Sequence, residues 1–273
     1  MKIFIVTDME GTAGVLDFQF CWNWEGIPSR LEEGRSLVTD EINAACQGFF
    51  DAGATEIDIL DGHGQGGIHQ ASLDPRTKLV VYNPGKYPFG VDETYDAMAW
   101  VGQHAKSSTP FSHIPHTGWF NVINYTINGV SVGEFGQMAM VGASMGVQPI
   151  FGSGEEAFAK EAVELVPGFE AVAVKRGLTP GSGEELNFEE YKNGYLSAFH
   201  LHPDTACKLI KEGAYRAAQR FIEDRDSFAM PTVNPPYNIW MKCREEGPKA
   251  PCEQIKSHPS NLIEAMNAKW KTI

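Results

Sequence analysis

The sequence has few cysteines and no pattern that would pair them. Its five cysteines among 273 residues are odd in number and widely spaced, and no two of them form a C-x-x-C pair. A disulfide framework and a thiolate zinc site are therefore not indicated. A reducing compartment is the simplest interpretation, and we expect the protein to be cytoplasmic.

Long apolar runs and clusters of positive charge are also missing. No stretch is long enough to cross a bilayer, and the apolar run at residues 3–6 is too short for the core of a signal peptide. The 22 Lys and Arg face 35 Asp and Glu, which gives a net charge of −13 without any basic run. Because nucleic-acid binding relies on clustered Lys and Arg, we expect neither a nucleic-acid partner nor a membrane partner.

What is present is the pattern of a globular α/β protein. Hydrophobic residues make up 42% and charged residues 21% of the chain, close to the globular average. Short apolar runs typical of buried strands alternate with stretches of helical periodicity. The predicted strands are 2–7, 56–60, 79–82, 97–102, 147–151 and 171–175, with a hairpin at 122–132 and helices at 31–50, 135–145 and 155–165. This alternation predicts an α/β fold with a mainly parallel or mixed sheet covered by helices.

The chain divides into three predicted regions. Residues 1–176 are predicted to form an α/β domain, which contains all the candidate metal-binding and catalytic residues described below. Residues 177–198 are rich in Gly, Glu and Asn with weak periodicity, and they are predicted to be an inserted loop or excursion. Residues 199–273 form a less regular helical and mixed C-terminal region that packs on the same domain. It has a helix from Pro203 to about 222, an apolar run at 237–241 and a last helix near 262–270.

Five side chains with metal-binding chemistry follow predicted strands at the point where each strand ends. They are Asp8, Glu10, His63, His104 and Glu134. Ligands of open α/β sheets collect at the carboxyl ends of the strands. Three carboxylates and two imidazoles suit Zn²⁺, with Mn²⁺, Co²⁺ or Fe²⁺ as alternatives.

Five ligands are more than one catalytic zinc uses, since such an ion normally takes three protein ligands and a water. Two divalent metal ions about 3.5–4 Å apart, bridged by a shared carboxylate such as Asp8, would use all five. Such a pair lowers the pKa of water and polarises a carbonyl, which is how an amide is hydrolysed without a covalent intermediate.

Each of these residues also has an ordinary structural interpretation. Asp8 or Glu10 can be a cap or a loop residue, Glu134 can favour the start of a helix, and a lone histidine is more often structural than a ligand. Taken together, carboxylates and histidines buried at separate strand ends need partners that offset their desolvation, and metal ions would supply these partners.

Two further histidines lie on a proline-containing loop close in sequence to His104. His116, and the nearby His113, could donate a hydrogen bond to a developing oxyanion without being metal ligands. Either one can equally be a solvated loop residue.

Several motifs occur in an order that resembles a known family. They are Asp8-Met9-Glu10-Gly11, Glu33-Gly34-Arg35, Thr39-Asp40-Glu41-Ile42-Asn43, Asp61-Gly62-His63, Gly102-Gln103-His104-Ala105 and Val132-Gly133-Glu134. Over roughly the first two-thirds of the chain the sequence resembles the DppA-type D-aminopeptidases, the dinuclear zinc peptidases of the M55 class. It departs from them at Gly62, where the family usually has Ser, and at 179–195, which looks like an insertion.

The resemblance implies that Asp8, Glu10, His63, His104 and Glu134 bind two zinc ions, with Asp8 bridging. It implies that His116 is the catalytic histidine. It also implies an aminopeptidase that hydrolyses short peptides with an N-terminal D-amino acid, and a homo-oligomer, a decameric ring whose active sites face an inner channel.

Two other functions remain open on the residues alone. Asp8-Met9-Glu10-Gly11-Thr12 after a strand also resembles the signature of haloacid-dehalogenase-like phosphatases, in which Asp8 would be a nucleophile and Mg²⁺ the cofactor. That function needs a late acidic pair, for which Glu155-Glu156 is the candidate. A phosphatase of this kind would not use His63 or His104 in catalysis. A non-catalytic small-molecule-binding domain, with these residues as structural caps, is the second alternative.

Overall fold

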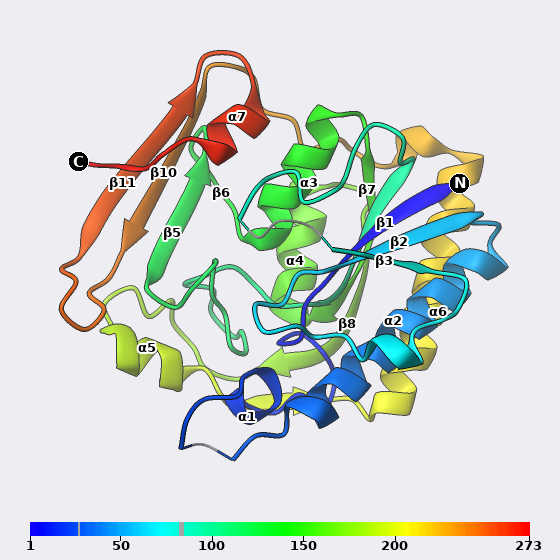
Figure 1. Cartoon of the computed structure of the whole chain (residues 1–273), viewed down its shortest axis with the longest axis horizontal. Helices are drawn as coiled ribbons and strands as arrows, with labels where there is room; N and C mark the ends of the chain where they lie inside the picture. Colours follow the sequence, from blue (N-terminus) through cyan, green and yellow to red (C-terminus); the bar gives the residue numbers. More distant parts are fainter. Residues whose placement is uncertain (27, 82–84) are drawn as a thin grey trace.

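A seven-stranded sheet forms the centre of the molecule (Figure 1). The computed structural model describes residues 1–26, 28–81 and 85–273. The strand order is β3-β2-β1-β4-β7-β8-β9, and all strands are parallel to their neighbours except β9, which is antiparallel to β8. Their bounds are Lys2–Thr7 (β1), Glu56–Asp61 (β2), Lys78–Val80 (β3), Ala97–Gln103 (β4), Gln148–Glu155 (β7), Glu170–Gly177 (β8) and Ala198–His200 (β9).

Helices cover both faces of this sheet. On one face lie α2 (Leu31–Asp51) and α6 (Pro203–Glu223), and on the other α3 (Glu134–Ser144) and α4 (Glu156–Leu165). Alternate residues of β1 serve the two layers: Ile3 and Ile5 pack in the core with α2 and α6, whereas Phe4 and Val6 pack in the core with α3 and α4. Burial on both faces explains why the central strands are continuous apolar runs.

A second sheet of five antiparallel strands lies beside the first. Its order is β12-β11-β10-β5-β6. The bounds are Val122–Ile127 (β5), Val130–Ser131 (β6), Tyr237–Cys243 (β10), Cys252–His258 (β11) and Lys271–Thr272 (β12). Ile127 and Ile239 of this sheet pack with Val141 of α3 and with Ala265 of α7 (Leu262–Asn267), so α3 lies between the two sheets.

The expected fold class is confirmed: the main sheet is largely parallel and is covered by helices. The helices predicted at 31–50 and 203–222 are α2 and α6, and the hairpin turns at Asn128 and Gly129, whose φ angles are 50° and 81°. The strand predicted at 79–82 is β3, and its last predicted residue lies outside the described residues. The division of the chain after residues 176 and 198 stays a prediction.

Two expectations about the second half need correction. The excursion at 177–198 is not a plain loop, because it contains α5 (Phe188–Gly194), which begins with a capping box between Asn187 and Glu190. The last helix ends at Asn267 and not near residue 270, and the less regular C-terminal region contributes three strands to the second sheet. The remaining short elements are α1 (Phe18–Cys21) and two 3₁₀ turns, Gln70–Ser72 and Arg225–Ser227.

No helix in residues 1–26, 28–81 and 85–273 combines the length and the apolar character that crossing a membrane requires.

Candidate metal centre

The five predicted ligands come from four segments that meet at one edge of the main sheet. Asp8 and Glu10 follow β1, His63 follows β2, His104 follows β4, and Glu134 is the first residue of α3. Because β2, β1 and β4 are parallel neighbours, their carboxyl ends lie side by side. The structure therefore brings together the residues that the sequence singled out.

Glycines allow the strand ends to approach this closely. The amide of Asp8 donates to the carbonyl of Val101 at 2.9 Å. Gly102 has a φ of +75°, and a Cβ there would lie 2.1 Å from the carbonyl oxygen of Asp8. A Cβ on Gly154 of β7 would lie 1.9 Å from the carbonyl oxygen of Gln103. Side chains at these two positions would push the ligand-bearing segments apart.

The ligand atoms lie within a few ångströms of one another. His104 Nε2 is 3.1 Å from Asp8 Oδ2 and 3.7 Å from Glu134 Oε2, and His63 Nε2 is 3.3 Å from Glu10 Oε1. Single ligand atoms of Asp8, Glu10 and His104 all lie within 4.8 Å of one another. These are separations that a metal ion among the groups could bridge.

The hydrogen bonds of His104 leave one ring nitrogen directed at the carboxylates. Its Nδ1 lies 2.8 Å from the carbonyl oxygen of Ala105, which can only accept, so Nδ1 carries the proton. The buried Nε2 of His104, Oε1 of Glu10 and both ring nitrogens of His63 have no hydrogen-bond partner in the described part of the chain. Lone pairs of imidazoles and carboxylates that face one another repel unless positive charge lies between them, so these residues fit a metal site.

The pKa shifts of the clustered residues also indicate a metal site. Burial, reinforced by the charge of Glu10, raises the pKa of Asp8 to about 8. Burial opposes protonation of His104, but Asp8 and Glu134 outweigh it and raise the pKa of His104 well above its usual range. The cluster thus gains from positive charge, which divalent cations provide while the ligands stay as carboxylates and neutral imidazoles.

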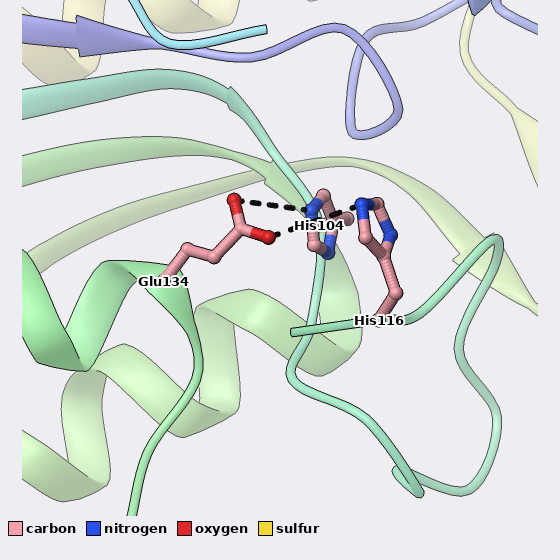
Figure 2. Close-up of side chains that lie close together, drawn as sticks. All are labelled: His104, His116 and Glu134. Atoms are coloured by element: carbon pink, nitrogen blue, oxygen red, sulfur yellow. Dashed lines mark ion pairs between the residues drawn. The ribbon is translucent and has the colours of Figure 1, made fainter. Parts of the chain in front are cut away.

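His116 lies against this cluster, and His113 does not belong to it. The His116 ring stacks between His104, with centroids 3.9 Å apart, and Phe120, with centroids 4.7 Å apart. Its Nδ1 lies 3.0 Å from the carbonyl oxygen of Ile114, and its Nε2 lies 3.8 Å from Glu134 Oε1 (Figure 2). Burial and the charge of His104 lower the pKa of His116, so the ring is neutral at neutral pH.

His113 is also buried, but its Nε2 lies 3.2 Å from the carbonyl oxygen of Leu16, and its ring contacts His200 edge-on. Of the two loop histidines, only His116 faces the predicted ligands.

Sequence analysis missed the role of Glu155, at the end of β7. This fully buried carboxylate accepts from the backbone amide of Ala105 at 2.7 Å and from that of His113 at 2.5 Å. It ties the segment after His104 to the loop that carries His116. The sequence held one signal for it, a carboxylate that follows the apolar run at 147–151.

Glu156, the other half of the candidate acidic pair, lies near the surface and pairs with Lys160. Glu155 and Glu156 therefore do not form the acidic pair that the phosphatase interpretation requires.

The site opens into a cavity of about 770 Å³. His63, His116 and Glu134 line it together with aromatic rings from both halves of the chain. Those rings belong to Trp22, Tyr87, Phe89, Trp119, Tyr125 and Trp270. The ring of Trp22 lies 5.6 Å from that of His63, so one aromatic wall borders the cluster directly.

Comparisons with known proteins agree on one family. The Peptidase_M55 model, described as D-aminopeptidase, matches residues 1–195. A D-aminopeptidase of Bacillus subtilis (strain 168) is 31% identical over 182 residues, 66% of this chain and 65% of that protein, so the alignment spans less than two thirds of the relative. The solved structure of the Zn-dependent D-aminopeptidase DppA from Bacillus subtilis, described as a self-compartmentalizing protease, matches with a TM-score of 0.79 at 23% identity, covering 97% of this chain and 94% of that chain. At this identity the structural match shows a shared fold.

Proposed function

Because the chain belongs to the peptidase M55 family of D-aminopeptidases, we propose that it is a metal-dependent aminopeptidase that hydrolyses short peptides with an N-terminal D-amino acid. The family suggested by the sequence motifs is thereby confirmed. The observation that carries the proposed activity is the convergence of three carboxylates and two imidazoles at one sheet edge, beside a cavity large enough for a short peptide.

We propose that Asp8, Glu10, His63, His104 and Glu134 hold two zinc ions, with Asp8 as the bridging ligand. Their number supports two ions, since one catalytic zinc leaves too many ligands unused. The description of the solved relative as Zn-dependent supports the choice of metal.

Two zinc ions held by these residues would supply a water nucleophile at neutral pH and would polarise the scissile carbonyl. His116 contributes proton transfer. Its Nδ1 proton is bound to the carbonyl of Ile114, so the neutral ring presents an unprotonated Nε2 toward the site. We propose that this nitrogen takes a proton from the attacking water and returns it to the leaving amine. The oxyanion-donor role expected from the sequence stays a prediction: the resting ring has no Nε2 proton, but the ring that has taken a proton from the water has one to donate.

We also propose a homo-oligomer and a cytoplasmic location. The relative's description as self-compartmentalizing supports a closed assembly, and a decamer would show by light scattering as a mass near ten times the 30.0 kDa chain. The odd number of cysteines and the lack of any C-x-x-C pair suit a reducing compartment.

Hydrolysis of D-Ala-D-Ala and of L-Ala-L-Ala by the zinc-loaded protein tests the proposed activity. We expect release of alanine from the D-peptide, with loss of at least about 100-fold in kcat for His116→Asn. His202→Asn is the matched control, because His202 is a histidine at the exposed start of α6 and asparagine preserves its capping role. Cleavage of the L-peptide alone would contradict D-specificity, and equal loss in the control would contradict the role of His116.

A further inference from the structure

A lysine from the second sheet lines the same cavity as the candidate metal centre. Lys256 lies on β11 and is 8% exposed. Among the described residues that line the cavity it is the only lysine or arginine, whereas Asp8, Glu10, Asp61 and Glu134 place negative charge elsewhere on the wall. The cavity thus has acidic groups at the metal centre and one cation contributed by a different sheet.

The ammonium group of Lys256 is only partly compensated by the protein. It donates to the carbonyl of Met266, in the last turn of α7, and lies 4.4 Å from the centroid of the Trp270 ring. No carboxylate of the described chain lies within 4.0 Å of it. A carbonyl and an aromatic face offset part of the cost of burying a charge, but a buried ammonium normally also has an anionic partner. Burial lowers the pKa of Lys256 to about 8, so the group is still charged at neutral pH.

Other polar and aromatic side chains line the cavity together with Glu134 and Lys256. Gln137 lies one turn after Glu134 on α3, and its Oε1 accepts from the hydroxyl of Tyr87 at 2.6 Å. Tyr125 contacts both neighbours of Lys256, with its hydroxyl 3.6 Å from Met266 Sδ and its ring 5.8 Å from that of Trp270. Tyr87, Tyr125 and Trp270 all line the cavity. The cavity that Glu134 and Lys256 share is therefore rich in aromatic rings, which suits the backbone and small side chains of a peptide.

We propose that Lys256 binds the C-terminal carboxylate of the peptide substrate, so that the site selects short peptides with a free carboxyl end over peptide amides. This inference rests on the proposed function. A peptide acid matches this layout, with its scissile bond at the metal centre and its carboxylate on the lysine. An extended chain advances about 3.3–3.6 Å per residue, so peptides of two to four residues are the lengths to compare.

The test uses D-alanyl peptides of two, three and four residues, each as the free acid and as the C-terminal amide. For wild type we expect kcat/KM to favour the acid by about tenfold or more at the best length, as for a charge-assisted hydrogen bond. Lys256→Met keeps the length of the side chain and removes its charge, and it should abolish this preference through a higher KM for the acid. Lys256→Arg should retain it. Lys242→Met on the neighbouring strand, where the lysine is exposed, is the matched control.

The acid-to-amide ratio is independent of how much of a variant is folded, because both substrates meet the same active enzyme. Equal hydrolysis of acids and amides by wild type at every length, or a preference that survives in Lys256→Met, would overturn the inference. If wild type cleaves neither form, the proposed function fails, and calorimetric binding of the same peptides then decides the subsite. Tighter binding of the acid that Lys256→Met removes supports the subsite, and equal binding overturns it.

Discussion

Replacing Glu155 with glutamine should loosen the connection between the segments that carry His104 and His116. The wild-type carboxylate accepts from the amides of Ala105 and His113, and both contacts are buried. A glutamine can accept from one of these amides, but it turns its own N–H groups toward the other.

The expected size of the effect follows from that one unpaired amide. Leaving a buried N–H without an acceptor costs about 1–3 kcal/mol, which lowers the melting temperature by several degrees in a protein of this size. The catalytic effect should be larger, since a displacement of about 1 Å in a catalytic group can cost about 100-fold in rate. We therefore expect kcat to fall about 10–100-fold with little change in KM.

Steady-state kinetics on D-Ala-D-Ala and hydrogen exchange followed by mass spectrometry test this reasoning together. Exchange should rise in peptides that cover residues 104–116 and stay unchanged in α2 and α6. Glu156→Gln is the matched control, because this neighbouring carboxylate makes only a near-surface pair with Lys160. Wild-type kcat in Glu155→Gln, or a rise in exchange spread evenly over the chain, would refute a local positioning role.

Three further predictions concern the framework around the site. Gly102→Ala should destabilise the protein by more than about 3 kcal/mol, because its Cβ would meet the backbone of Asp8, whereas Gly64→Ala, with nothing within 4 Å, should leave the melting temperature nearly unchanged. Burial raises the pKa of Glu41 from 4.5 to about 8, so the folded protein keeps a proton there and loses stability as the pH rises through that range. Glu41→Gln still accepts from the Ala13 amide, so its melting temperature relative to wild type should increase between about pH 5 and pH 8.5, and a constant difference would contradict the pKa shift. Removal of metal by a chelator should lower the melting temperature, and adding Zn²⁺ should restore it. A melting temperature that neither treatment changes would argue against a metal site.

Much of the site was predictable because its signal is local. Apolar runs that end in Asp8, His63 and His104 show which residues stand at strand ends, and parallel strands bring those ends to one edge. The periodicity of α2 and α6 likewise predicted their bounds almost to the residue.

The second sheet was not predictable by the same means. Ile239 of β10 pairs with Ile127 of β5, which lies more than a hundred residues earlier in the chain, and a short apolar run does not reveal such a partner. The helix α5 was missed although Asn187 and Glu190 have the spacing of a capping box. Because no long stretch of helical periodicity follows Asn187, the capping box alone was not enough to predict a helix.

The other features that the sequence did not predict depend on contacts between side chains and distant parts of the backbone. The tautomer of His116 depends on the carbonyl of Ile114, and the position of Glu155 depends on two amides from another segment. Lys256 reaches the cavity only because β11 joins the sheet that contains Tyr125. The linear sequence shows a carboxylate at Glu155, but it reveals none of these contacts.

Metal content per chain tests the central claim most directly. It is measured by plasma mass spectrometry on wild type and His104→Ala, both purified without chelator or metal-affinity resin. A dinuclear centre predicts about two equivalents of zinc or a similar ion in wild type and a clear fall in the variant, because His104 faces both Asp8 and Glu134. A wild-type protein that is metal-free, stays folded and takes up no transition metal when offered it would contradict the account.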